Sequence, residues 1–213
     1  MGHSAINHDT EPIRLFKSNF LEFFTHIHPA VVVLLWLPLC LYFLLAEVIN
    51  ASGRATGMAH IPAAFTIGLF IWTFAEYTLH RFLFHYKPKV PKAEKIFFLF
   101  HGVHHAQPQC KTRLVMPPVL SIPMALVFYW LFSRVVGGLL GAPAWVGPMF
   151  SGFGIGYLVY DLTHYATHHF AMRSGVLKYL KRYHMQHHYK TPDARFGVSS
   201  PLWDIVFNTK PAK

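Results

Sequence analysis

VVVLLWLPLCLYFLLAEVI, residues 31–49, is an apolar stretch interrupted only by Pro38 and by Glu47 near its end. A helix that crosses a lipid bilayer needs about 20 predominantly apolar residues. This stretch has that length, and it therefore predicts a transmembrane helix. It indicates that the fold is an all-α integral membrane protein.

Three further apolar segments predict three more transmembrane helices, at about residues 61–84, 119–140 and 144–160. The segment 61–84 becomes polar in its last third. The last two segments are joined by a short GAP sequence, so we expect them to form an antiparallel hairpin. The fourth segment contains SGFGIGY, residues 151–157, and small residues of this kind let helix backbones approach closely.

The composition supports a membrane protein. The 213 residues are 53% hydrophobic and only 13% charged, which is too apolar for a typical soluble domain. The formal net charge is +10, but nucleic-acid-binding proteins gather their Lys and Arg on a soluble surface. Here the charges lie between long apolar runs, so we expect no nucleic-acid partner. The alternative is a soluble protein of large hydrophobic helical hairpins.

The distribution of basic residues predicts the orientation in the membrane. Four crossings leave the N-terminus and residues 85–117 and 161–213 on one side. Together with Arg81, which lies near the end of the second span, that side holds every Lys and Arg except Arg54 and Arg134. Because cytoplasmic loops carry an excess of Lys and Arg, this side and both termini are predicted to be cytoplasmic.

The predicted domain organisation follows from the four crossings. Residues 1–28 form a cytosolic N-terminal segment, and residues 29–213 form one membrane domain. Its cytosolic catalytic parts lie at about 80–117 and 161–213. The first 28 residues lack a short apolar core and a cleavage site, so we expect no removable signal peptide.

The two cysteines indicate neither a disulfide nor a cysteine metal site. Cys40 lies inside the first apolar stretch and Cys110 lies in a polar segment. No CxxC spacing is present.

Histidines dominate the segments beside the second and fourth predicted spans. Eleven of the sixteen lie in four short clusters: HRFLFH at 80–85, HGVHH at 101–105, HYATHH at 164–169 and HMQHH at 184–188. All four clusters fall on the predicted cytoplasmic side. Neutral imidazole suits iron, zinc, copper and nickel, so the clusters indicate a metal site.

The spacing within each cluster selects the candidate ligands. Residues at i, i+3 and i+4 share one face of a helix. His169 lies well round the helix from His164 and is expected outside the site. His80 and His85 are five apart, so we expect the helix to end or distort between them. Ten ligands remain, and they imply two metal ions: His80, His85, His101, His104, His105, His164, His168, His184, His187 and His188.

Two acids are candidates for holding these ligands. A metal-bound histidine usually donates its other ring N–H to a carboxylate or carbonyl. Glu76 lies one turn before His80, and Asp161 lies three residues before His164. Acids at the edge of membrane helices are functional candidates, although each could instead be a helix-end residue paired with a lysine.

Six segments together resemble the fatty acid hydroxylase superfamily of histidine-box membrane oxygenases, and within it the fatty acid 2-hydroxylases most closely. They are EYTLHRFLFH, HGVHH, RLVMPP, YDLTHYATHH, HMQHH and FGVSSPLWDIVFNT, in this order within about residues 70–208. The histidine clusters carry the resemblance to the superfamily. RLVMPP and FGVSSPLWD carry the resemblance to the 2-hydroxylases.

This resemblance implies a four-helix membrane anchor capped by a cytosolic helical domain with a histidine-bound dimetal site. It implies insertion of one oxygen atom from O2 at C2 of a long acyl chain, free or lipid-linked. Iron is the expected metal, and zinc can be present in purified relatives. The implied ligands of one metal are His80, His85, His101, His105 and His187. Those of the other are His104, His164, His168, His184 and His188.

Five residues are candidates for contacting the membrane lipid substrate. Lys111 and Arg113 could meet an anionic head group, or could simply be charges that set the topology. Tyr157, Tyr160 and Trp203 could line the entrance for the acyl chain, although aromatic residues are common at membrane interfaces.

Two departures from the family pattern matter. Cys110 stands where the family often has an Asp shortly before the Arg of RLVMPP. Some relatives carry a fused haem electron carrier, for which this chain has no room, so we expect a separate electron-donor protein. The sequence does not indicate the oligomeric state.

Three alternative functions remain open. A sterol or carotenoid hydroxylase or desaturase would share every metal ligand. A metal-binding or transport protein would need no oxygenase chemistry, but transport predicts ionisable ligands at the bilayer midplane. A dizinc hydrolase would need an acid that activates a metal-bound water, for which Asp193 is the candidate.

Overall fold

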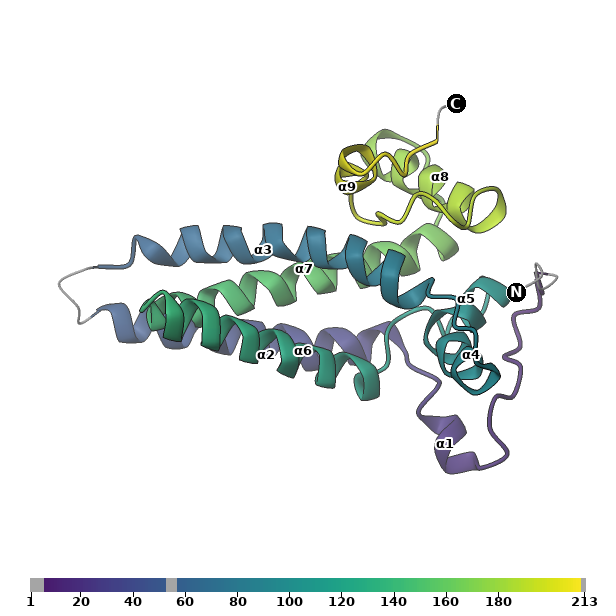
Figure 1. The fold of residues 1–213 in the computed structure, drawn as a ribbon, viewed down its shortest axis with the longest axis horizontal. Helices are drawn as coiled ribbons and strands as arrows, with labels where there is room; N and C mark the ends of the chain where they lie inside the picture. Colours follow the sequence, from purple (N-terminus) through teal and green to yellow (C-terminus); the bar gives the residue numbers. More distant parts are fainter. Residues whose placement is uncertain (1–5, 53–56, 212–213) are drawn as a thin grey trace. The chain divides into compact units, whose positions relative to one another are not determined.

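The computed structural model describes residues 6–52 and 57–211, and these are helical or irregular, with no strand among them (Figure 1). Arg54, which the orientation argument used, lies outside the described residues. The chain divides into two compact units. One, the membrane unit, contains residues 30–72 and 116–159. The other, the histidine unit, contains residues 1–29, 73–115 and 160–213.

Long helices build the membrane unit. They are α2 (Pro29–Ser52), α3 (His60–Thr78), α6 (Pro118–Phe132) with its π-helical extension η3 (Ser133–Leu139), and α7 (Pro143–His169). The predicted spans 31–49, 119–140 and 144–160 fall on these helices, and the span 61–84 runs from α3 into the π-helix Leu79–Phe84. α7 continues past residue 160, so His164, His168 and His169 lie on the same helix as the apolar segment. Because His164 and His168 are four residues apart on this helix, they lie about one turn apart on the same face.

The hairpin predicted for the third and fourth segments is present. Gly137 lies beside Val146, and farther from the turn the Phe132 ring contacts the Phe153 ring with centroids 5.5 Å apart. Residues late in the third segment contact residues early in α7, and earlier residues contact later ones. α6 and α7 are therefore antiparallel.

Glycine lets α3 and α7 approach closely, as the SGFGIGY segment predicts. A Cβ atom added to Gly152 would lie 2.0 Å from the carbonyl oxygen of Phe65. A Cβ atom added to Gly68 would lie 1.9 Å from the carbonyl oxygen of Met149. Any side chain at either position would force the two helices apart, which fits the role of small residues between membrane helices.

Two of the described helices are long and apolar enough to cross a membrane. They are Pro29–Ser52, with a mean hydropathy of 2.4, and Pro118–Leu139, with a mean hydropathy of 1.8. Large apolar side chains point outward from the first: Leu34 is 74% exposed and Ile49 is 72% exposed. Apolar surface of this kind is suited to contact with lipid rather than water.

Shorter helices build the histidine unit. Besides the ends of α3 and α7, they are α1 (Asn19–Phe23), η1 (Leu79–Phe84), α4 (Pro91–Phe97), η2 (Phe98–Gly102), α5 (Val103–Ala106), α8 (Gly175–Tyr189) and α9 (Leu202–Val206). A distortion was expected between His80 and His85, and η1 provides it. η1 is π-helical, and the backbone N–H of His85 donates to the carbonyl of His80, five residues back, at 3.1 Å. Residues five apart are therefore neighbours on this turn.

Candidate metal centre

Ten histidines of the histidine unit gather into two groups of five. In each group, one nitrogen from every ring lies within 4.8 Å of the corresponding nitrogens of the others. Site I consists of His80, His85, His101, His105 and His187. Site II consists of His104, His164, His168, His184 and His188. These are the ten residues expected from the sequence, and the division is the one that the family resemblance implies.

Helical spacing alone does not explain this division. His101 and His105 turn to site I, whereas His104 between them turns to site II. On α8, His184 and His188 join site II and His187 joins site I. In these two clusters the i, i+4 pair therefore serves one site, and the i+3 residue serves the other.

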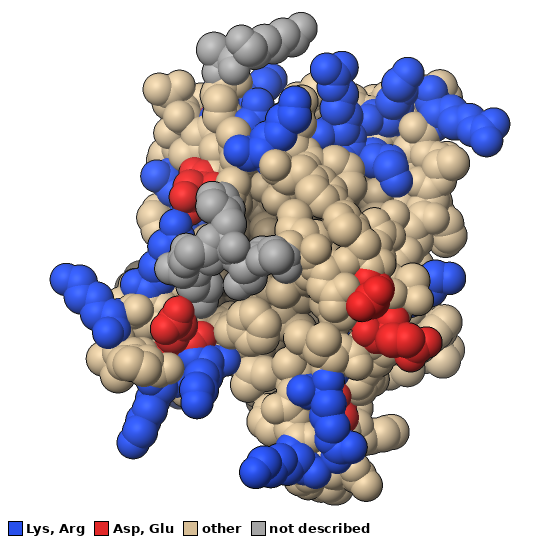
Figure 2. Space-filling model, turned by 90° about the vertical axis from the view of Figure 1, so that its right-hand side faces the viewer, with Lys and Arg blue, Asp and Glu red and all other residues tan. Residues whose placement is uncertain are grey.

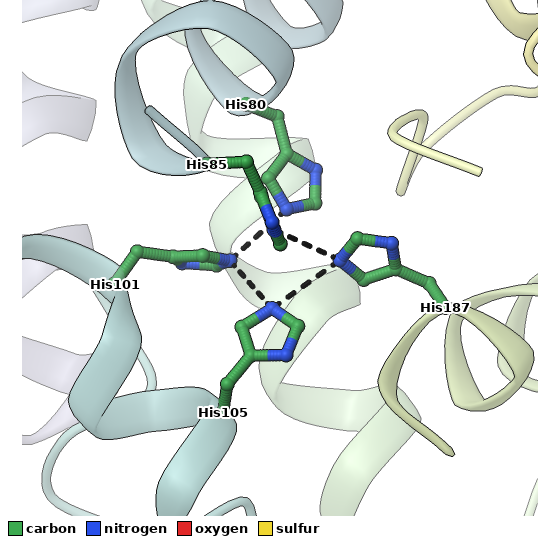
Figure 3. Close-up of side chains that lie close together, drawn as sticks. All are labelled: His80, His85, His101, His105 and His187. Carbon is green, nitrogen blue, oxygen red and sulfur yellow. Dashed lines mark hydrogen bonds between the residues drawn. The ribbon is translucent and has the colours of Figure 1, made fainter. Parts of the chain in front are cut away.

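Site I draws its rings from three parts of the histidine unit (Figure 3). The π-turn η1 and the residue after it supply His80 and His85. The helix formed by η2 and α5 supplies His101 and His105, and α8 supplies His187. Figure 3 shows the five rings directing a nitrogen toward a common centre.

The distances between ring nitrogens fit bound metal ions. Neighbouring Nε2 atoms are 3.0–3.2 Å apart in site I and 2.9–3.0 Å apart in site II. With metal–nitrogen bonds of about 2.0–2.1 Å, ligands at right angles are about 3.0 Å apart and tetrahedral ligands about 3.3 Å apart. The spacing therefore fits ions with more than four ligands better than tetrahedral ions.

Hydrogen bonds fix which nitrogen faces the centre of site I. His80 donates from Nδ1 to the carbonyl oxygen of Phe196 at 2.5 Å, and His187 donates from Nδ1 to that of Ala194 at 2.7 Å. Because a neutral imidazole carries one N–H, the Nε2 atoms of both rings must present lone pairs. Lone pairs at 3 Å from other ring nitrogens repel each other unless a cation or a proton lies between them.

Burial keeps these imidazoles neutral. The side chains of His184 and His187 are fully buried, and desolvation holds the pKa of both well below the ordinary histidine range, with neighbouring histidines adding to the effect. Burial likewise lowers the pKa of His105 to about 3. Neutral imidazole is the form that binds transition metals, so ten uncharged ligands are available at neutral pH.

The loop of residues 194–199 supplies the two carbonyl acceptors, and two buried acids hold this loop. Asp204 of α9 accepts the backbone N–H groups of Phe196 and Gly197 at 2.9 and 2.7 Å. Glu76 of α3 accepts those of Val198 and Ser199 at 2.6 and 2.8 Å. The amide groups of the loop thus face two carboxylates, while its carbonyl groups face two histidines of site I.

Two features of this arrangement differ from the sequence expectation. Glu76 acts on His80 through the loop, because the Nδ1 atom of His80 donates to a carbonyl and not to the carboxylate. The role of Asp204 was missed, although the residue ends the FGVSSPLWD segment. Its signal was an acid placed inside an otherwise apolar helix, and its side chain is fully buried.

The chain matches the family model described as fatty acid hydroxylase over residues 65–209. It is 38% identical to a dihydroceramide fatty acyl 2-hydroxylase of Arabidopsis thaliana, over 93% of this chain and 80% of the relative. It is 34% identical to the fatty acid 2-hydroxylase of Homo sapiens, over 94% of this chain and 57% of the relative. A solved structure of full-length scs7p, in which only the hydroxylase domain is visible, superposes with a TM-score of 0.81. That structure is 37% identical and covers 91% of this chain and 70% of its own.

The chain belongs to the fatty acid hydroxylase family. Its relatives are named as fatty acid 2-hydroxylases and ceramide hydroxylases, which identifies it as a lipid-hydroxylating enzyme. The ten histidines lie inside the matched region, so the two sites belong to the part of the hydroxylase that the family shares.

Asp161 and His169 are the remaining acid and histidine near the predicted site. Asp161 is fully buried on α7, three residues before His164. His169 belongs to neither site, and its ring lies against Tyr165 with centroids 4.7 Å apart. The direct action of Asp161 on a ligand histidine stays a prediction.

The predicted substrate residues lie in different surroundings. Lys111 is exposed. The Arg113 side chain is only 2% exposed, and it forms an ion pair of 2.6 Å with Glu22. The ring of Tyr160 is buried and stacks on His164 with centroids 5.8 Å apart. These three residues, and Tyr157 and Trp203 described below, stay predictions as substrate contacts.

Tyr157 and Trp203 belong to different units. The Trp203 indole donates to the hydroxyl of Thr73 at 2.9 Å within the histidine unit. Tyr157 lines a small apolar cavity in the membrane unit, together with Trp36 and Trp72.

Two further residues named in the sequence analysis lie near the surface of the histidine unit. Asp193 forms an exposed ion pair with Lys87 at 2.6 Å, so its carboxylate faces a lysine. Both line an open cavity that reaches His85 and His105 of site I. Cys110 is buried, with its sulfur 3.7 Å from the hydroxyl of Thr112.

Proposed function

We propose that this hydroxylase inserts one oxygen atom from O2 at C2 of a long acyl chain, using two iron ions held at sites I and II. The observation that carries the proposal is the pair of five-histidine sites in a chain related over most of its length to acyl 2-hydroxylases. Its substrate is an acyl chain, free or linked to a lipid, and the relatives named for dihydroceramide and ceramide favour the amide-linked form.

The chemistry that bound iron supplies is the activation of O2 by external electrons for attack on an unactivated C–H bond. The residues of the chain provide the conditions for it. Ten neutral imidazoles supply the ligands, and burial of all five histidines of site II limits the access of water there. The loop of residues 194–199 orients His80 and His187 through its carbonyl groups.

We propose four membrane spans, with the histidine clusters and both termini in the cytoplasm. Two of the described helices qualify as spans by length and hydropathy, and the long helices α3 and α7 supply the other two. Lys and Arg side chains outnumber Asp and Glu on the face shown in Figure 2, in keeping with the rule that positive charge stays inside.

The cavity beside Tyr157 supports the choice of an apolar substrate. Most of its walls come from one face of α6 (Ser121, Met124, Ala125 and Phe128) and one face of α7 (Phe150, Phe153, Gly154 and Tyr157), and Trp36, Trp72 and Met116 complete them. Both sets follow the i, i+3, i+4, i+7 spacing of a single helix face. We propose that this cavity accommodates methylene groups of an acyl chain.

Electrons come from a separate donor protein in this proposal. Asp193, the acid that a hydrolase would need, is exposed and pairs with Lys87 at the surface, and this does not favour a hydrolase function.

Growth under labelled O2 tests the proposed reaction. Cells that express the chain with an electron donor should contain 2-hydroxy acyl chains whose added oxygen carries the label, detected by mass spectrometry after lipid hydrolysis. Cells that express His104→Ala serve as the matched control. Label on a sterol or carotenoid ring, or a new double bond, would assign the chain to another branch of the superfamily. The absence of label from all lipids would contradict the oxygenase function.

A further inference from the structure

The short helix α1 and the residue that follows it expose three phenyl rings. Phe20 is 71% exposed, Phe23 is 72% exposed and Phe24 is 42% exposed. The rings form one cluster, because Phe24 contacts Phe20 and Phe23 with centroids 5.1 and 5.5 Å apart. We call these three residues the phenyl cluster. A folded protein rarely leaves a contiguous aromatic patch in water, so such a patch marks a surface that binds something.

The phenyl cluster does not sit on a loose tail, because Arg113 holds the segment around it. One guanidinium nitrogen of Arg113 donates to the carbonyl oxygen of Ile13 at 2.5 Å, and the other donates to Glu22 of α1 at 2.6 Å. Glu22 in turn accepts the backbone N–H groups of Leu15 and Phe16 at 3.0 and 2.8 Å. Arg113 therefore fixes both ends of the segment that leads into α1.

Further hydrogen bonds continue this attachment on both sides of α1. The backbone N–H of Ile13 donates to the side chain of Gln107 at 2.9 Å. After α1, the backbone N–H of Ile27 donates to the carbonyl of Thr112 at 2.8 Å. The histidine unit thus holds residues 13–27 in place, while the phenyl rings point away from it.

The position in the chain indicates what covers the phenyl cluster. Only four residues separate Phe24 from Pro29, the first residue of the candidate membrane helix α2. Five extended peptide steps reach no farther than about 18 Å, so α1 must lie near the level at which α2 enters a bilayer. Aromatic side chains concentrate at that level.

The charges beside the phenyl cluster fit the same surface. Arg14 and Lys17 are exposed just before α1. Basic residues next to exposed aromatic residues are typical of segments that lie on a membrane containing anionic lipids.

We propose that α1 and Phe24 form an anchor that lies in the cytoplasmic lipid interface, and that Arg113 is the positioning residue that ties this anchor to the metal-binding unit. This assigns a role to the first residue of the RLVMPP segment. The proposal rests on the membrane location in the proposed function, and it adds that the histidine unit contacts lipid through α1.

A spin label attached at position 23 tests the anchor. The two native cysteines are each only 1% exposed, so the variant Phe23→Cys offers one reactive thiol. The full-length protein is placed, one copy per disc, in nanodiscs of phosphatidylcholine and phosphatidylserine. Collision rates are then measured with O2, which concentrates in lipid, and with chromium oxalate, which stays in water. We expect the label at position 23 to be relaxed by O2 and protected from chromium oxalate.

Two further labels make the result interpretable. Glu11→Cys lies two residues before the attached segment, where the Glu11 carbonyl accepts from Gln107, is exposed and polar, and should show the reverse pattern. Leu34→Cys lies on the outward face of α2 and should show the lipid pattern. If the label at Leu34→Cys is relaxed by O2 while the label at Phe23→Cys is relaxed by chromium oxalate, the proposed anchor is wrong and the membrane location stands. If both labels are relaxed by chromium oxalate, the proposed membrane location is wrong. Protection of position 23 from both reagents would mean that protein covers the phenyl cluster, and this would also overturn the anchor.

The role of Arg113 is tested in the Phe23→Cys background. Arg113→Lys retains the charge but cannot reach the Ile13 carbonyl and the Glu22 carboxylate together. We expect the label at position 23 to become more mobile and to lose its protection from chromium oxalate, while bound metal stays at two ions per chain. Unchanged mobility and protection would show that Arg113 does not position the anchor.

Discussion

An imidazole can present either of its nitrogens to a metal, and the hydrogen bond on the other nitrogen decides which. At site I this choice is made for His80 and His187 by two backbone carbonyls. Those carbonyls stay in place only if the amide groups of the same loop are satisfied on its other side. Asp204 and Glu76 satisfy them, so acids that touch no histidine control how two histidines are oriented.

Replacing Asp204 should therefore weaken site I and leave site II intact. Asp204→Asn removes one of the two carboxylate oxygens that accept the N–H groups of Phe196 and Gly197, and places an NH2 group there instead. Loss of an outer hydrogen-bond partner typically costs about 10- to 100-fold in metal affinity. Metal analysis after dialysis should give about one ion per chain instead of two.

Asp193→Asn is the matched control for Asp204→Asn. Asp193 lies near the same loop, but it is exposed and pairs only with Lys87. It should retain both ions. Loss of both ions in Asp204→Asn, with the helical content lowered, would mean that Asp204 supports the whole fold and not site I alone.

Removing a ligand should act on its own site. His104→Ala and His184→Ala each take one imidazole from site II, where no other described histidine is placed to substitute. Bound metal should fall toward one ion per chain and hydroxylation should be lost. His169→Ala removes a neighbouring histidine that belongs to neither site, and it should keep both ions. Full metal content in His104→Ala or His184→Ala would contradict the ligand assignment.

At the residue scale, the sequence reveals side chains better than it reveals backbone groups. The ten histidines could be selected because imidazole is rare in apolar segments and its spacing is visible. The carbonyls of Ala194 and Phe196 could not be selected, because every residue has one and only the folded loop aims them. Asp204 and the pairing of Glu22 with Arg113 depend on contacts across the chain and were missed for the same reason.

At the scale of elements, helix period and helix distortion both matter. The α-helical period explains why His184 and His188 share site II. The π-turn η1 explains how His80 and His85 share site I, since its i→i+5 hydrogen bond brings residues five apart together. The need for a distortion could be predicted from the spacing. Its form could not, because several kinds of helix break would satisfy the same two histidines.

The sequence pattern also could not predict that histidines on the same helix face would belong to different metal sites. His101, His104 and His105 share a face by period, yet His104 belongs to site II. Two metal positions lie close enough for one helix to serve both, and adjacent side chains on a face then diverge. The ring of His105 stacks on that of His188 of site II with centroids 4.1 Å apart, which shows how closely the two sites approach.

The cavity that α6 and α7 line predicts how a substitution on α6 changes the chain length of the products. Ala125 lines this cavity, and the phenyl ring of Ala125→Phe should occupy part of it. If the cavity holds methylene groups, hydroxylation of the longest acyl chains should fall more than that of shorter ones. The chain-length distribution of the 2-hydroxy products, measured by mass spectrometry, reports this shift.

The neighbouring residue supplies the control for Ala125→Phe. Leu126 is 63% exposed and faces away from the cavity, so Leu126→Phe should leave the product distribution unchanged. Overpacking alone costs about 1–3 kcal/mol of stability, and the melting temperature of both variants separates that effect from the loss of the cavity. An equal fall for all chain lengths would contradict a role of the cavity in holding the chain.

At the scale of the whole molecule, the concentration of buried histidines links stability to pH. In the folded, metal-free chain, burial holds the pKa of His101, His104 and His188 well below the ordinary range, and that of His105 at about 3. In the unfolded chain the same side chains take up protons near pH 6.5. Below that pH the unfolded state therefore binds more protons than the folded state.

The sign of the effect follows from this difference in proton binding. The stability contribution of these histidines is fully present above pH 6.5 and is lost progressively as the pH falls toward the folded-state values. Each histidine that is protonated only in the unfolded state lowers the free energy of unfolding by about 1.4 kcal/mol per pH unit. Bound metal opposes this loss, because protons must displace it from the same nitrogens.

We expect the chelator-stripped protein in detergent to melt at a constant temperature from pH 8 to about 7, and at steadily lower temperatures from about pH 6.5 to 5, because its histidines titrate only in the unfolded state there. The metal-loaded protein should begin this decline at lower pH, and its onset should coincide with release of the ions. Metal-free His184→Ala should show a shallower decline than the metal-free parent, since one buried imidazole fewer takes up a proton on unfolding. His169→Ala removes a half-buried histidine outside both sites and should follow the parent more closely. A melting temperature independent of pH between 7 and 5 in the stripped protein would mean that the fold does not hold the imidazoles neutral. This would contradict the argument that burial keeps the metal ligands uncharged.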